Sequence, residues 1–104
     1  AALKKLELAR ALATQPRLLL ADESLNGLDH GEMEQAADML ERVRTEKKIT
    51  IVWVEHIMGV LMRVVDRVIV LDHSEVIFDG LPRDAQTNKR VVEVYLGSET
   101  PAGA

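Results

Sequence analysis

The chain has 104 residues, which is enough for one domain or part of one. Apolar residues make up 47% of it and charged residues 29%, as is typical of soluble globular proteins. The net charge of −4 gives no electrostatic case for binding nucleic acid. The absence of cysteine excludes a disulfide framework and a thiolate zinc site. No apolar run in the sequence approaches the roughly 20 residues that a membrane-spanning helix needs.

The first half of the chain alternates between helical and strand patterns. Leucine and alanine at helical spacing predict a helix over residues 2–14, which Pro16 ends. The apolar run 18–21 predicts a short buried strand, and turn-forming residues follow it over 24–31. A second helix is predicted from Met33 to Lys48. The run 49–54 is almost wholly apolar and β-branched, which predicts a strand that is covered on both faces.

The second half of the chain predicts smaller elements. A short helix is expected over 57–64, and two further strands form a hairpin over 67–79. Pro82 begins a short turn or helix. Asn88 is a plausible N-cap for a last helix that reaches Leu96 and that Gly97 ends. Disorder is expected over residues 98–104.

Strand and helix alternate with crossovers long enough to hold a helix, which predicts a parallel sheet with helices on its faces. The carboxyl ends of parallel strands meet at one edge, where such sheets bind ligands. Asp22 and Glu23 follow the first strand directly, and His56 stands at the end of the second. These three side chains together suggest phosphate chemistry assisted by a metal ion.

Each of these residues also has a plainer interpretation. Asp22 and Glu23 could both lie in a solvated loop, and His56 could be a structural histidine with its hydrogen bonds satisfied. Asp29 fits a helix N-cap, a role that would be compatible with a functional one. His30 and His73 lie in turn-like segments and are interpreted as solvated.

Four motifs in order resemble the nucleotide-binding subunit of ABC transporters. Residues 8–12 with Pro16 look like the helix after the family's signature motif, and residues 18–22 look like the Walker B strand. Residues 25–29 match the D-loop, and Glu55-His56 matches the switch histidine. The ending, residues 91–97, looks like the C-terminus of the branched-chain amino acid importer group.

The resemblance implies a fold and a chemistry for residues 1–97. The fold would be part of a P-loop NTPase (RecA-like) α/β domain, a parallel sheet with flanking helices and a C-terminal β-hairpin. In the intact subunit Asp22 would position Mg²⁺ through water, Glu23 would polarise the attacking water, and His56 would contact the γ-phosphate of ATP. Asp29 would lie at the dimer interface and report across it.

The resemblance also implies partners and a place in the cell. Two ATPase subunits, identical or paralogous, would sandwich two ATP molecules and drive transmembrane permease subunits. The subunit would be cytoplasmic and peripheral on the inner face of the membrane, in an importer of branched-chain amino acids or similar polar solutes. Two alternatives stay open: an ABC-type ATPase that acts in translation or DNA repair, and a non-catalytic interaction module.

Three departures from the family pattern are visible. Ser24 replaces the usual proline, and Ser74 replaces a turn glycine, so that turn must use another backbone form or tolerate strain. The third departure is larger, because the Walker A loop, the Q-loop and the signature motif lie upstream in the family. We therefore expect a C-terminal piece, natural, cloned short or proteolytic, with negligible ATP affinity and no activity alone. Losing a central strand should also make it self-associate or exchange strands with a copy.

Overall fold

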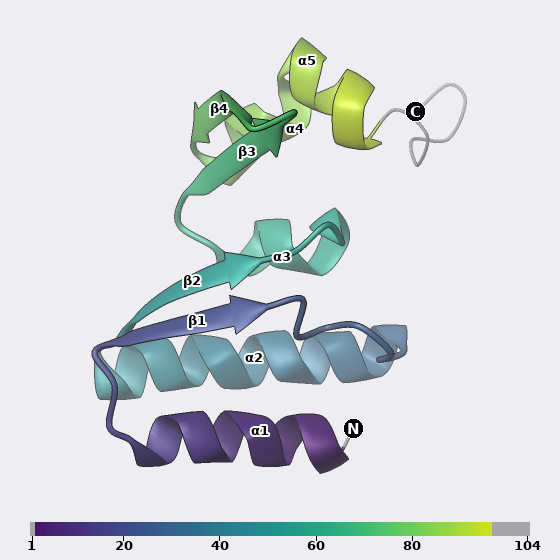
Figure 1. The fold of residues 1–104 in the computed structure, drawn as a ribbon. Helices are drawn as coiled ribbons and strands as arrows, with labels where there is room; N and C mark the ends of the chain where they lie inside the picture. The colour runs from purple at the N-terminus through teal and green to yellow at the C-terminus, as the bar shows by residue number, and fades with distance from the viewer. Residues whose placement is uncertain (1, 97–104) are drawn as a thin grey trace. The chain divides into compact units, whose positions relative to one another are not determined.

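A computed structural model of the chain describes residues 2–96, of which Leu96 is described by its backbone alone. The described residues form two compact units, 2–64 and 65–96. The first unit contains α1 (Ala2–Ala13), β1 (Leu18–Asp22), α2 (His30–Lys47), β2 (Thr50–Val54) and α3 (Met58–Val64). The second contains β3 (Val68–Asp72), β4 (Glu75–Gly80), α4 (Pro82–Thr87), α5 (Lys89–Val91) and a π-helical turn, η1 (Val92–Leu96). The predicted order of helices and strands is confirmed, with boundaries shifted by a few residues (Figure 1).

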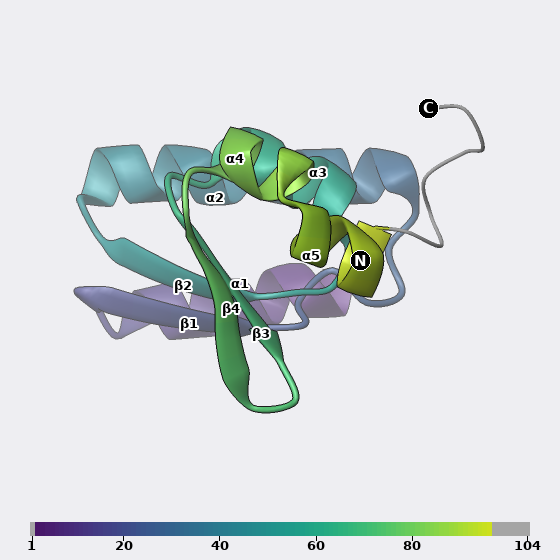
Figure 2. The same ribbon diagram turned by 90° about the horizontal axis from the view of Figure 1, so that it is seen from above.

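The sheet of the first unit consists of β1 and β2, which run parallel and side by side (Figure 2). Their register runs from Leu18 opposite Thr50 to Asp22 opposite Val54, so the two strands end level with each other. The connection between them contains α2, as a parallel pair requires. The centre of the core is Leu19, Leu40 and Ile49. Apolar side chains of α1, α2 and β2 pack around these three: Leu8, Ala11, Leu12, Val43, Ile51 and Trp53.

The expectation that these strands are buried on both faces is wrong for the described residues. Alternate side chains are exposed by 47–68%, and they all lie on the face away from the core: Leu18, Leu20, Val52 and Val54. Both α1 and α2 contribute to the core on the other face. A continuous apolar run is the pattern of a strand covered on two sides, but which segment supplies the second cover is not encoded in the strand itself.

Helix α2 has sharply defined ends. Asp29 is its N-cap and forms a capping box with Glu32, so two backbone N–H groups of the first turn are satisfied. At the other end Lys48 adopts the left-handed conformation with φ of 55°, a common way to end a helix. The helix therefore begins three residues before Met33, the first residue of its apolar pattern, because the cap and not the pattern fixes where it starts.

The second unit is an antiparallel hairpin, β3 and β4, joined by His73 and Ser74. Both turn residues have positive φ, 49° and 64°, so the turn keeps the left-handed form without glycine. Each such residue costs about 1–2 kcal/mol relative to right-handed backbone. Helices α4 and α5 contribute the buried Ala85 and Val91 to this unit.

The last predicted helix is only partly regular. Asn88 caps it as expected, accepting the N–H of Val91 at 3.1 Å, but the α-helix ends after three residues and continues as the π-helical turn. The predicted end at Gly97 and the predicted disorder of 98–104 lie outside the described residues.

Candidate functional site

The two predicted functional loops meet beyond the ends of β1 and β2. The Oε1 atom of Glu23 lies 3.9 Å from Nδ1 of His56, although 33 positions separate the two residues in the chain. The two side chains are 51% and 59% exposed. At 3.9 Å they are too far apart for a hydrogen bond, and they form an ion pair only when the imidazole is protonated. The pairing of parallel strands alone therefore brings an acid and an imidazole to one exposed edge.

Asp22 is the last residue of β1, and its side chain is exposed. No group of three or more acidic or histidine side chains that could hold a metal ion occurs among residues 2–96. A divalent cation at this edge would therefore take few ligands from the protein and the rest from water or phosphate oxygens. Mg²⁺ is commonly held this way, by one or two carboxylates and several waters, so the donor set fits that ion.

Glu23 has a strained backbone. Its φ of 49° lies in the left-handed region, which residues with a Cβ rarely adopt, and such strain is concentrated at functional sites. Its N–H donates to the carbonyl oxygen of Val54 at 2.8 Å, so β2 holds the residue on one side. The side chain of Asn26 donates through Nδ2 to Oε2 of Glu23 at 3.1 Å. One carboxylate oxygen is thus held within the loop, and the other faces His56.

The residues after Glu23 are bonded to β2 and the residue that follows it. The indole Nε1 of Trp53 donates to Oγ of Ser24 at 3.1 Å, and the N–H of Leu25 donates to Oε1 of Glu55 at 3.1 Å. Leu25 is fully buried, so it anchors the loop as well. From the sequence alone, Glu55 is placed in the motif of the switch histidine, but neither Glu55 nor Trp53 is given a role of its own. Their place at the end of a strand, beside the predicted switch histidine His56, is the one signal that could have singled them out.

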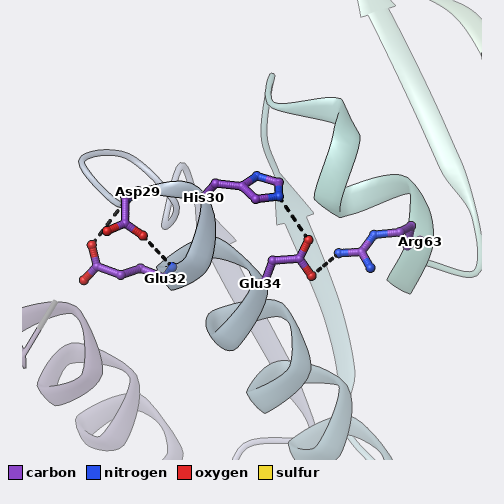
Figure 3. Close-up of polar contacts among 5 residues, drawn as sticks. All are labelled: Asp29, His30, Glu32, Glu34 and Arg63. Carbon is purple, nitrogen blue, oxygen red and sulfur yellow. Dashed lines mark hydrogen bonds and ion pairs between the residues drawn. The ribbon is translucent and has the colours of Figure 1, made fainter.

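Asp29 lies at the N-terminus of α2, where its role in the capping box is plain (Figure 3). The N–H of Glu32 donates to Oδ1 of Asp29 at 2.8 Å, and the N–H of Asp29 donates to Oε1 of Glu32 at 3.2 Å. Both interpretations of Asp29, a cap and a functional residue, remain compatible with this geometry, since a cap uses one carboxylate oxygen.

A polar network ties α2 to α3 one turn further along (Figure 3). The Arg63 guanidinium donates to Oε2 of Glu34, and His30 Nε2 lies 3.3 Å from Oε1 of the same carboxylate. The hydrogen bond from Arg63 lowers the pKa of Glu34 below its usual range. This contact joins the helix that follows the Asp29 loop to the helix that follows His56. His30 and His73 are both highly exposed, in agreement with their interpretation as solvated.

Over residues 2–96, no helix has the length and apolar character needed to cross a bilayer. No protein family model matches the chain. Individual proteins do match it. The branched-chain amino acid transport ATP-binding protein BraF of Pseudomonas aeruginosa is 32% identical over 94 residues, which is 90% of this chain and 37% of that protein. LivG of Escherichia coli, with the same description, matches at the same identity and coverage.

A second group of relatives imports a different solute. The methionine import ATP-binding protein MetN 4 of Oceanobacillus iheyensis is 36% identical over 104 aligned residues, covering 94% of this chain and 30% of that protein. The chain thus spans about a third of the length of the relatives it matches. Over nine-tenths of its own length, however, it is similar to the ATP-binding subunits of ABC transporters, and this relationship confirms the resemblance drawn from its motifs.

Proposed function

We propose that this chain is the C-terminal part of the ATP-binding subunit of an ABC importer and supplies the water-activating side of its ATPase site. The observation that carries the proposal is the approach of Glu23 to His56, at 3.9 Å, in a chain related to such subunits. The phosphate-binding loop would come from the part of the subunit that precedes residue 1. The 104-residue chain alone would then bind ATP poorly and hydrolyse none.

Each residue at the strand ends has a task in this proposal. Glu23 would accept a hydrogen bond from the attacking water and orient it, since its side chain is half exposed and its Oε2 is held by Asn26. His56, also exposed, would donate to a γ-phosphate oxygen. Asp22 would hold Mg²⁺ through water, and that ion supplies charge neutralisation for the phosphate oxygens when bound.

We infer the partners from the resemblance to the ATP-binding subunits of ABC transporters. A second ATPase subunit, identical or paralogous, would face Asp29, whose carboxylate stands at the exposed start of α2. Transmembrane permease subunits would anchor the pair to the inner face of the membrane, with the ATPase on the cytoplasmic side. Branched-chain amino acids or similar polar solutes are the proposed cargo, because two of the matched relatives carry that description.

The proposal is tested in the full-length subunit by the substitution Glu23→Gln. Removing the charged oxygen should abolish steady-state ATP hydrolysis while leaving ATP binding intact, because the phosphate contacts lie elsewhere. Glu46→Gln on the exposed surface of α2 is the matched control and should change neither property. Near-normal hydrolysis by Glu23→Gln would remove Glu23 from its proposed task.

A further inference from the structure

Three consecutive residues of the loop after β1 are each bonded to the end of β2 or to Glu55, the residue that follows it. Glu23 is bonded to Val54 through the backbone, Ser24 to Trp53 through their side chains, and the backbone N–H of Leu25 to the side chain of Glu55. Only the first of these three bonds continues the ladder of the sheet. The other two depend on the side chains of Trp53 and Glu55.

These bonds hold a loop whose backbone is strained at Glu23, the residue proposed to orient the attacking water. The left-handed backbone at Glu23 persists only if the surroundings hold it there, since an unrestrained residue with a Cβ would relax. The hydroxyl of Ser24 accepts a hydrogen bond from the indole of Trp53, so a cross-strand contact restrains the residue that follows Glu23.

Only one of the two carboxylate oxygens of Glu55 has a hydrogen-bond partner among the described residues. Its Oε1 accepts the N–H of Leu25, but its Oε2 is buried and has no hydrogen-bond partner among the described residues. A buried oxygen without a partner is destabilising, and an apolar residue of similar size would avoid that penalty. Glu55 is therefore poorly explained by stability alone. It also directly precedes His56, so whatever fixes Glu55 also fixes the start of the histidine loop.

We propose that Glu55 is a positioning residue, which locks the Glu23 loop to the His56 loop and so sets the separation of Glu23 and His56, with Trp53 as a second support. This role rests on the proposed ATPase function. Glu55 makes no contact with the reacting groups in this proposal. Its loss should therefore slow the chemical step and leave the binding of ATP unchanged.

The decisive substitution is Glu55→Met, which keeps the length of the side chain, cannot accept the N–H of Leu25, and removes the buried unpaired oxygen. In the full-length subunit kcat should fall about tenfold to a hundredfold, the range expected when a hydrogen bond that aligns reacting groups is lost. KM for ATP should stay within about twofold, because uniform binding is untouched. Glu55→Gln keeps an oxygen acceptor for Leu25 and should restore most of kcat. Glu46→Met, on the exposed face of α2, is the matched control.

A second measurement reports on the bond itself and needs no nucleotide. Amide hydrogen exchange at Leu25, followed by NMR in the nucleotide-free full-length subunit, should speed up in Glu55→Met and stay slow in Glu55→Gln.

The outcomes separate cleanly. Slower hydrolysis with faster Leu25 exchange, both reversed by Glu55→Gln, supports the proposal. Unchanged Leu25 exchange in Glu55→Met overturns it, and so does faster exchange with unchanged kcat. A fall in thermal stability that parallels the fall in kcat would assign Glu55 a merely structural role and also overturn it. An unsubstituted full-length subunit without ATPase activity would refute the proposed function, and the positioning role with it, whatever Leu25 exchange showed.

Discussion

Substitution of Asp29 tests its structural role as the N-cap of α2. The substitution Asp29→Ala removes the oxygen that accepts the N–H of Glu32 at 2.8 Å, and so breaks the capping box of an 18-residue helix. Losing an N-cap side chain costs about 0.5–2 kcal/mol. The lost negative charge at the helix N-terminus adds about 0.3–1 kcal/mol. Together these give a decrease of about 1–2 kcal/mol in the free energy of unfolding, since the two contributions overlap.

Urea unfolding of the 104-residue chain, followed by far-ultraviolet circular dichroism, measures this change. With a slope of about 2 kcal/mol per molar urea, the midpoint should fall by about 0.5–1 M. Asp29→Ser keeps a capping oxygen without the charge and should lose much less. Asp38→Ala, an exposed position within α2, is the matched control and should not lower the midpoint. An unchanged midpoint in Asp29→Ala would refute the reasoning.

Two further predictions concern the hairpin. Ser74→Gly places at φ 64° a residue that adopts this backbone without strain, and it should raise the free energy of unfolding by about 0.5–1 kcal/mol in thermal denaturation. Ser74→Ala should leave that free energy unchanged. Equal effects of the two substitutions would show that the turn is unstrained. The Arg67 guanidinium lowers the pKa of Asp79 through two hydrogen bonds of 2.7 Å. The pair therefore stabilises the fold fully at a pH above the pKa of the carboxyl in the unfolded chain. This stabilisation is lost as the pH falls through the lower pKa of the folded state. In Arg67→Met the pKa of Asp79, measured by NMR titration of its carboxyl carbon, should rise toward the usual value, and an unshifted titration would contradict the pairing.

The elements of the fold were largely predictable because their signals are local. Apolar spacing located α1 and α2, and Asp29 and Asn88 act as caps in the structure as their residue types indicated. The cover of the strands was not predictable, since Leu20 and Val52 look the same in sequence whether or not another segment packs on them. Local patterns do not report what lies across a sheet.

At the strand ends, topology predicted more than residue type did. Once the two strands were taken as parallel and adjacent, the approach of Glu23 to His56 followed from where each strand stops. The bonds of Trp53 and Glu55 were not foreseeable, because a side-chain bond between residues about 30 positions apart leaves no trace in spacing or composition. The positive φ at Glu23 was not foreseeable either, because glutamate is not a residue type that indicates left-handed backbone.

At position 23, where the backbone is left-handed, stability favours glycine and the proposed chemistry favours glutamate. Glycine there would relax the chain and add stability, but it would remove the carboxylate. Under the proposed function, the strained backbone is the structural cost of keeping a carboxylate at this edge of the sheet.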